Sequence, residues 1–263
     1  MTTWFQPKLL EGRTALVTGG GTGICRGIAL AFARAGCDVA IASRNADHLA
    51  STVVDLEACG VKALGVPGDV RDPASVDQIV AESARALGGL DILVNGAAGN
   101  FICAAEKLSP NGFGTVVDID LKGTFNVSRA ALPHLKTRRG VILNISATLQ
   151  LLGTAGQAHA AAAKAGIDSL TRTLAVEWGP AGIRVNGLAP GPVEGTEGVS
   201  RLTTPESRAL IEQLCPLGRM ATIDEVADAA LYLCSDASRF ITGVTLVIDG
   251  GLWLKSGRAL PVS

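Results

Sequence analysis

The sequence is poor in aromatic residues and contains a single tyrosine, Tyr232. Charged residues make up only 18% of the chain, the formal net charge is −1, and the basic residues form no block. Nucleic acids and anionic membrane surfaces are bound through clustered Lys and Arg, so this charge pattern argues against both as partners. An acidic substrate would have to be held by individual Arg or Lys side chains.

The sequence also lacks the cysteine patterns of a metal site. Its six cysteines include no CxxC pair, and no Cys/His cluster has zinc spacing, so we expect no bound metal. We interpret the cysteines as reduced, small apolar residues in a cytosol-like compartment. The first ten residues have no apolar signal-peptide core, and residues 259–263 are not an S-K-L-type peroxisomal address. The expected location is therefore cytoplasmic.

No apolar run has the character of a membrane span. Residues 141–163 carry no formal charge and are long enough to cross a bilayer, but they contain Asn144, Ser146, Gln150, Gln157 and His159. We interpret this segment as a strand, a loop and the start of a helix. Within it, we expect Asn144 to satisfy backbone groups near the strand, and His159 to be packed or bonded to water, with a direct role in the chemistry as the alternative.

Short apolar runs alternate with amphipathic stretches along the whole chain, and hydrophobic residues make up 48% of it. The predicted strands are 14–18, 38–42, 61–66, 91–94, 141–145, 183–188 and 245–248. The predicted helices are one that ends at 35, then 46–59, 73–87, 111–135, 156–178 and 223–235. Continuous apolar strands separated by helices are typical of a parallel sheet buried on both faces. The sequence predicts one α/β domain over 1–263, a doubly wound, Rossmann-like parallel sheet with helices on both faces.

One stretch, 191–205, lacks a regular pattern and is rich in Gly, Pro and Thr. Long irregular stretches inside compact domains are often functional, so we expect a mobile lid there.

A glycine-rich turn follows the first strand. It consists of Gly19, Gly20, Gly21, Thr22, Gly23 and Ile24. Glycines let the backbone approach a pyrophosphate, and the N-terminus of the helix that follows offers unpaired N–H groups. The position of this turn between a strand and a helix, at the start of a βα repeat, is the context that supports a dinucleotide site. Cys25 takes the place of a third glycine, and we expect it to crowd the helix slightly.

The end of the second strand favours NADP(H) over NAD. An NAD site prefers a carboxylate near Ser43, whereas here Arg44 follows, and a guanidinium can pair with a 2′-phosphate. The alternative, that Arg44 is a solvated residue at a helix start, stays open. After the third strand, we expect Asp69 to accept a hydrogen bond from the adenine amino group. The residues after the fourth strand, where the backbone would lie beside the nucleotide, are Asn95, Gly96 and Ala97.

Together these segments resemble the short-chain dehydrogenase/reductase family over nearly the whole chain. The other matching segments are Lys164, 184–186, 190–192 and 249–251. In that family a tyrosine usually stands four residues before the active-site lysine, with a serine thirteen residues before the tyrosine. Here those positions hold Ala160 and Ala147. Because alanine cannot donate a proton, ketone reduction with a tyrosine acid is not expected.

One subgroup of the family, the peroxisomal-type 2,4-dienoyl-CoA reductases, also lacks this tyrosine, and the sequence resembles that subgroup. The similarity covers 95–101, 118–120, 123–129, His159 with Lys164, 174–180, 188–192 and 195–198. This resemblance implies reduction of a 2,4-dienoyl-CoA by NADPH to a 3-enoyl-CoA, as part of unsaturated fatty acid β-oxidation. A water held between Asp120 and Lys164 would deliver the proton, and Lys164 would also bond the nicotinamide ribose. By resemblance, a peroxisomal location is the alternative to the cytoplasmic one, although the S-K-L-type tail is missing.

The resemblance implies further binding residues. It extends the cofactor site to Val70, Pro190, Gly191, Pro192, Val193 and Thr196, with the Thr196 hydroxyl on a phosphate. For the acyl-CoA substrate it points to Arg71, Phe101, Ser109, Pro110, Asn111 and Arg201. In this interpretation Phe101 stacks on the acyl chain or on adenine, and Arg71 and Arg201 meet CoA phosphates. An exposed arginine without a ligand is the alternative for both.

Two other functions remain compatible with the sequence. One is a reductase of another enoyl- or ketoacyl-CoA, and the other is a catalytically silent NADP(H)-binding protein, because both the serine and the tyrosine are missing. Retention of Lys164 beside Asp120 favours an enzyme. By analogy with the family, we expect a homotetramer formed through the helices 111–135 and 156–178 and the last strand.

Overall fold

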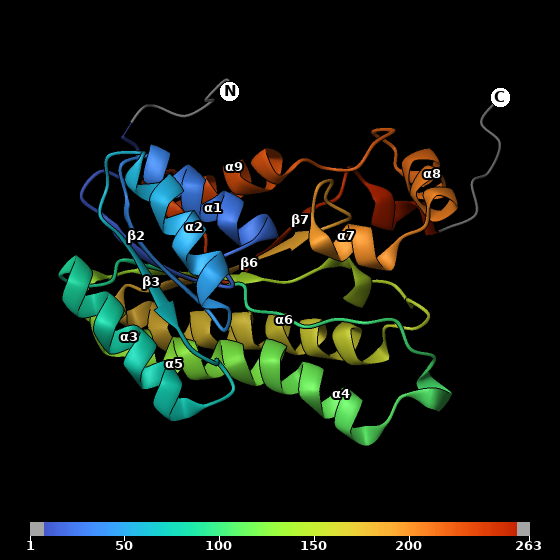
Figure 1. Cartoon of the computed structure of the whole chain (residues 1–263), viewed down its shortest axis with the longest axis horizontal. Helices are drawn as coiled ribbons and strands as arrows, with labels where there is room; N and C mark the ends of the chain where they lie inside the picture. The colour runs from blue at the N-terminus through green and yellow to red at the C-terminus, as the bar shows by residue number, and fades with distance from the viewer. Residues whose placement is uncertain (1–7, 257–263) are drawn as a thin grey trace.

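The computed structural model describes residues 8–256 and contains one sheet of seven parallel strands (Figure 1). The strand order is β3-β2-β1-β4-β5-β6-β7. The strands are β1 (Thr14–Thr18), β2 (Asp38–Ser43), β3 (Ala63–Pro67), β4 (Ile92–Asn95), β5 (Val141–Ile145), β6 (Arg184–Pro190) and β7 (Thr245–Ile248). This is the predicted doubly wound sheet, and its order reverses between β1 and β4, where ligands bind in such folds. The tail 259–263 and residues 1–7 lie outside the described residues, so the expectations about targeting segments are not tested.

Helices cover both faces of the sheet, as Figure 1 shows. On one face lie α1 (Gly23–Arg34), α2 (Ala46–Glu57) and α9 (Ile223–Cys234). On the other lie α3 (Pro73–Leu87), α4 (Pro110–Val117), α5 (Gly123–Arg138) and α6 (Ala158–Trp178). None of the helices between residues 8 and 256 combines the length and the apolar character needed to cross a bilayer.

The strands are continuously apolar because each contributes side chains to the hydrophobic cores on both faces of the sheet. In β1, Ala15 and Val17 belong to the core under α1 and α9, whereas Leu16 between them belongs to the core under α3 and α5. All five residues of β1 and of β5 are buried. Side chains in a strand alternate between faces, so burial on both faces requires an unbroken apolar run.

The segment 111–135, predicted as one helix, is interrupted. The chain forms α4, then a π-helical turn at Asp118–Lys122, then α5. A π-turn inserts one extra residue into a helix, and such turns are frequent at functional sites. The turn buries the Asp120 carboxylate, with the side chain only 1% exposed.

The segment 191–205 is more regular than expected. It contains α7 (Glu197–Leu202), and α8 (Pro205–Leu214), which the sequence did not predict, begins at its end. Side-chain oxygens cap the amino ends of both helices: the Thr196 hydroxyl accepts from the Val199 amide, and the Thr204 hydroxyl accepts from the Ser207 amide. The expectation of an irregular stretch was therefore wrong, and mobility of this region stays a prediction.

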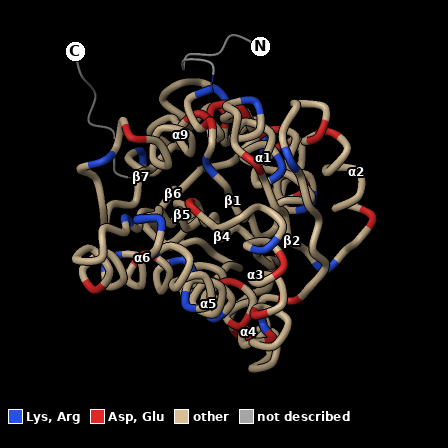
Figure 2. The backbone as a smooth tube through the Cα atoms, turned by 90° about the vertical axis from the view of Figure 1, so that its left-hand side faces the viewer, with Lys and Arg blue, Asp and Glu red and all other residues tan. Residues whose placement is uncertain are grey.

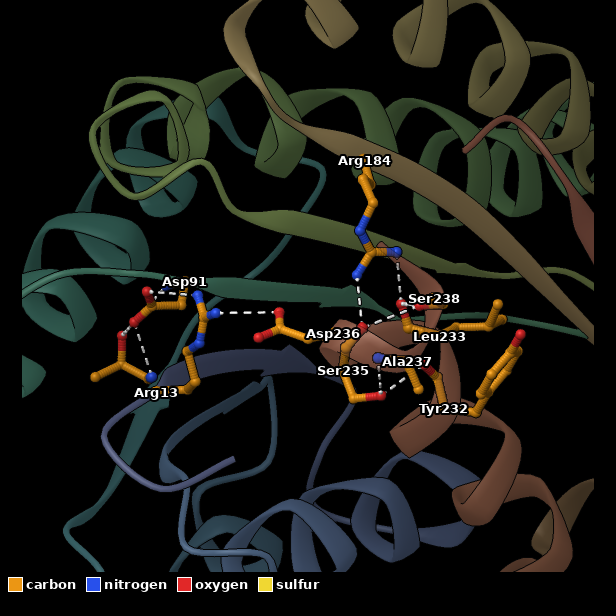
Figure 3. A network of polar contacts seen from close by, with 10 residues as sticks. Arg13, Asp91, Arg184, Tyr232, Leu233, Ser235, Asp236, Ala237 and Ser238 are labelled. Atoms are coloured by element: carbon orange, nitrogen blue, oxygen red, sulfur yellow. Dashed lines mark hydrogen bonds and ion pairs between the residues drawn. The ribbon is translucent and has the colours of Figure 1, made fainter. Parts of the chain in front are cut away.

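A polar network ties the amino ends of the central strands to the end of α9 (Figure 3). The Arg184 guanidinium, at the start of β6, donates to the carbonyl oxygens of Leu233, Ser235 and Ile241 at 2.9, 3.2 and 3.4 Å. Burial lowers the pKa of Arg184. The network lies at the opposite end of the strands from the glycine turn, so its role is structural.

Replacing Arg184 with methionine should lower the free energy of unfolding by about 2–4 kcal/mol, since three carbonyl groups lose a charged donor. Urea denaturation would measure this change. The matched control is Arg26→Met, because Arg26 makes an exposed ion pair with Asp55, and such pairs contribute about 0–1 kcal/mol. Equal effects of the two substitutions would contradict the assignment.

Candidate active site

The glycine turn is shaped by close contact with the strand beside it. A Cβ atom added to Gly19 would lie 2.7 Å from the Gly96 carbonyl oxygen, and Gly19 has a φ of +71°. A Cβ atom on Gly96 would lie 2.0 Å from the Cys25 sulfur. Cys25 therefore fits because Gly96 leaves room for it, and burial raises the pKa of its thiol to about 12. The thiol is a neutral packing group rather than a nucleophile.

The amino end of α1 lacks a side-chain cap. The Thr22 hydroxyl accepts no hydrogen bond from the first turn, whereas the Asn45 side chain caps α2. A helix start beside a glycine turn and without a side-chain cap is suited to an anion such as a pyrophosphate.

A pocket opens at this edge of the sheet, between the ends of β1, β2, β3 and β4. Its lining is Gly19, Gly21, Thr22, Ala42, Ser43, Arg44, Asn45, His48, Gly68, Asp69, Val70, Ala97, Ala98 and Ile119. The structure thus gathers Ser43, Arg44, Asp69 and Val70 around the glycine turn. Sequence reasoning missed Asn45 and His48, which lie just after Arg44 on a helix start with no motif of its own.

Two predicted ligand-binding residues bind each other in this structure. The Arg71 guanidinium donates to both Asp69 carboxylate oxygens, at 2.5 Å for the shortest contact. Hydrogen bonds from Arg71 hold the pKa of Asp69 below its usual value. Each side chain keeps donors or lone pairs outside this pair, so the contacts of Asp69 with adenine and of Arg71 with a phosphate stay predictions.

Asp120 and Lys164 meet at the carboxyl end of β5. The Lys164 Nζ lies 3.1 Å from the Asp120 Oδ2 and donates to the Ile145 carbonyl oxygen at 3.0 Å. The Gly99 amide donates to the Asp120 Oδ1 at 2.8 Å. The π-helical turn and α6 thus bring a carboxylate and an ammonium group together in the protein interior. The Asp120 side chain is 1% exposed and the Lys164 side chain is 10% exposed.

A network of side-chain amide and hydroxyl groups connects the elements around the Asp120–Lys164 pair. The Asn95 Nδ2 donates to the Asn144 Oδ1 and the Ser128 Oγ, each at 2.9 Å, and the Asn144 Nδ2 donates to the Thr171 Oγ1 at 2.9 Å. The expectation that Asn144 satisfies backbone groups was wrong, because its side chain bonds other side chains. This network fixes β4, β5, α5 and α6 relative to one another.

No phenol lies near this pair. Ala160 is 2% exposed on α6, one turn before Lys164. Tyr232 belongs to α9 and packs into the core on the opposite face of the sheet. His159 is fully buried, and its ring centroid lies 4.3 Å from that of Phe101. The prediction that His159 is packed is confirmed.

The other predicted residues lie on three separate segments. Ser109, Pro110 and Asn111 form the start of α4, where the Ser109 Oγ caps the helix. The Thr196 hydroxyl donates to the Val193 carbonyl oxygen at 2.7 Å. Arg201 forms an exposed ion pair with Glu197 at 3.1 Å. The segment Pro190, Gly191 and Pro192 leaves β6 at the carboxyl edge of the sheet.

Charged residues of both signs are intermixed over the described chain (Figure 2). Within residues 8–256, no group of three or more His, Cys, Asp or Glu side chains could hold a metal ion. The glycine turn, the pocket and the buried Asp120–Lys164 pair define a dinucleotide-dependent oxidoreductase.

Comparison with known proteins supports this class. A family model described as enoyl-(acyl carrier protein) reductase matches residues 19–253. The chain belongs to the short-chain dehydrogenase/reductase family.

Two relatives in sequence and one solved structure illustrate the similarity. The chain is 45% identical to the peroxisomal 2,4-dienoyl-CoA reductase [(3E)-enoyl-CoA-producing] of Arabidopsis thaliana, over 98% of this chain and 90% of the relative. It is 46% identical to the enzyme of the same name from Rattus norvegicus, over 95% and 87%. The crystal structure of a gluconate 5-dehydrogenase from Burkholderia cenocepacia, in complex with NADP and tartrate, has a TM-score of 0.88 and 33% identity, over 93% of this chain and 97% of that one.

Proposed function

We propose that this enzyme uses NADPH to reduce a 2,4-dienoyl-CoA to a 3-enoyl-CoA. The observation that carries the proposal is the buried Asp120–Lys164 pair, 3.1 Å apart, in a member of this family that has no tyrosine at the site. The names of the two relatives supply the substrate class. A conjugated thioester requires a proton at carbon rather than at a ketone oxygen, so a phenol beside a carbonyl is not needed.

The residues of the site fit the cofactor. Gly19 and Gly96 bring two backbone segments close together, the start of α1 has no side-chain cap, and Arg44 lines the same pocket. Bound NADPH supplies a hydride, which the proposal directs to Cδ of the dienoyl chain.

The Asp120–Lys164 pair would hold the water that protonates Cα. Asp120 would orient this water through its carboxylate, and the Lys164 cation would favour the negative charge that develops on the substrate. Because Lys164 also donates to the Ile145 carbonyl oxygen, its ammonium group is fixed in place. The remaining donor of this group is proposed to bond the nicotinamide ribose.

NADPH oxidation with 2,4-hexadienoyl-CoA tests the proposal directly. We expect the purified protein to turn over this substrate, with a 2-enoyl-CoA and a 3-ketoacyl-CoA as comparison substrates. Faster reduction of either comparison substrate would assign the site to another acyl-CoA reduction. Nucleotide binding without turnover of any of the three would contradict an enzymatic role.

Arg44 is proposed to select NADPH by pairing with its 2′-phosphate. An Arg44→Ala variant should bind NADPH about 10–100-fold more weakly, since a hydrogen bond to a charged group contributes about 1.5–3 kcal/mol. NADH binding should change little. Fluorescence titration with both nucleotides measures the effect, and Arg26→Ala, on α1 outside the pocket lining, is the control. Equal weakening for the two nucleotides would show that Arg44 does not contact the phosphate.

The acyl-CoA is proposed to lie along Phe101, the start of α4 and Arg201. A Cβ atom on Gly112 would lie 3.4 Å from the Phe101 Cζ, so Phe101 lies against the first turn of α4. The two relatives are named peroxisomal, and the compartment of this protein stays a prediction.

A homotetramer is proposed through α5, α6 and β7. Apolar side chains on these elements face solvent in the single chain, including Phe125 at 44%, Val176 at 78% and Leu246 at 37% exposed. Light scattering should give four times the 26.8 kDa chain mass, and Val176→Asp should reduce it because a charge at an interface loses its hydration. Val54→Asp, at an exposed position on α2, should not. A monomeric wild type would contradict the proposal.

A further inference from the structure

Buried polar atoms without a partner gather around one site. Across residues 8–256, seven residues carry a buried side-chain nitrogen or oxygen that makes no hydrogen bond, and all but Ser83 lie within 95–100 or 146–159. Those six are Asn95, Asn100, Ser146, Gln150, Gln157 and His159. Buried polar groups are normally satisfied, and leaving one unsatisfied costs about 1–3 kcal/mol. Their concentration around the carboxyl ends of β4 and β5 and the start of α6 indicates that a polar ligand binds in this region.

His159 is the most deeply placed member of this group. It is 0% exposed, and neither ring nitrogen has a hydrogen-bond partner. It belongs to the first turn of α6, directly before Ala160, which replaces the tyrosine, and the same helix carries Lys164. An imidazole has one N–H donor in its neutral form, so His159 brings a donor to the helix turn from which the phenol is missing.

The loop that covers His159 is anchored at both ends. The Gly99 amide donates to Asp120, and the Cys103 amide donates to the Gly156 carbonyl oxygen at 3.0 Å. Phe101, between these anchors, places its ring on the imidazole. Since Phe101 is 37% exposed, its ring can turn toward solvent without leaving a buried void. An acyl chain that lies along the turned ring would then reach the imidazole.

We propose that His159 donates a hydrogen bond to the thioester carbonyl oxygen of the substrate. This inference rests on the proposed function for the identity of the ligand as an acyl-CoA thioester. When hydride adds to Cδ, the electrons of the conjugated diene shift toward the thioester, and its carbonyl oxygen gains negative charge. The imidazole N–H stabilises that oxygen and keeps its proton. The electron pair on oxygen then re-forms the carbonyl group, the β,γ double bond remains, and Cα takes a proton from the water at Asp120 and Lys164. The hydroxide left by that water lies beside the Lys164 cation and takes up a proton from solvent.

Three variants separate hydrogen bonding from packing. His159→Phe keeps an aromatic ring against Phe101 but removes the donor, and His159→Gln keeps an amide donor. His134→Phe, on α5, makes the same substitution outside the site. Removal of one oxyanion donor typically lowers kcat by about 10²–10³-fold. We expect that loss in His159→Phe, a loss of about tenfold or less in His159→Gln, and wild-type kcat in His134→Phe.

The absorption of the bound dienoyl thioester supplies a readout that does not depend on reduction. In complexes with 2,4-hexadienoyl-CoA and NADP⁺, which cannot donate a hydride, a hydrogen bond to the carbonyl polarises the conjugated chain and shifts its absorption to longer wavelength. We expect the shift in wild type and in His159→Gln, and its absence in His159→Phe. A wild-type spectrum without a shift, or an unchanged shift and kcat in His159→Phe, would overturn the role of His159. A shift that depends on His159 without turnover by wild type would refute the proposed function and retain the carbonyl contact.

Discussion

An Asp120→Asn variant should reduce 2,4-hexadienoyl-CoA roughly 10²–10⁴-fold more slowly than wild type, since general acid catalysis typically contributes that factor to the rate. The substitution keeps the size of the side chain and one acceptor oxygen. That oxygen can accept from the Gly99 amide or from the Lys164 ammonium group, not from both, and the NH₂ group that replaces the other oxygen can accept from neither. The water would lose its carboxylate partner. Steady-state kinetics at saturating NADPH measure the change.

The effect should fall on kcat, because the carboxylate is proposed to act on the proton rather than on substrate affinity. Asp118→Asn is the matched control. Asp118 lies two positions earlier in the same π-helical turn, and its ion pair with Lys122 is exposed. This control should keep wild-type kcat. Full activity in Asp120→Asn, with NADPH binding intact, would remove Asp120 from the mechanism.

The sheet was predictable because each strand is buried on both faces. Strands β1, β5 and β7 begin and end at the predicted residues, as does α3. The start of α3 can be recognised in the sequence, since Asp72 caps its first turn and Pro73 stands at the first helical position. Other boundaries shifted by one to three residues, because apolar periodicity does not fix where a backbone hydrogen bond ends.

The interruption at Asp120 was not predictable from periodicity. A π-turn changes the helical register by one residue, and the apolar pattern on either side of it remains helical. Similarly, α8 has capping residues but no buried residue, so no apolar stripe marks it. These features depend on local hydrogen bonding that hydrophobic patterning does not record.

Individual site residues were predicted where a motif specifies them. The glycine turn and Arg44 follow from the βα arrangement, and the structure places both in one pocket. The Asp120–Lys164 pairing was inferred from resemblance, and the structure brings the two side chains within 3.1 Å. The pair of Arg71 with Asp69 and the bonds of Asn144 were missed, because partner choice depends on side-chain geometry across different elements.

Lys164→Met should have the second large effect, and it should act on stability as well as on catalysis. Removing the ammonium group leaves the Asp120 carboxylate, 1% exposed, with only the Gly99 amide as a partner. Breaking a buried ion pair in this way costs about 3–5 kcal/mol. Turnover should fall by about 10²–10⁴-fold, since the proton source loses its cation. Urea denaturation and kinetics measure the two losses separately.

The double variant Asp120→Asn with Lys164→Met distinguishes an unpaired charge from lost packing. Neutralising both partners removes the buried charge, so the double variant should be more stable than Lys164→Met alone, giving a coupling energy of about 1–3 kcal/mol. Lys122→Met, whose exposed ion pair is with Asp118, should change stability by less than about 1 kcal/mol. Additive effects in the double variant would mean that the two groups do not interact in solution. A water site shared by the two groups, and with it the substitute for the missing phenol, would then have to be abandoned.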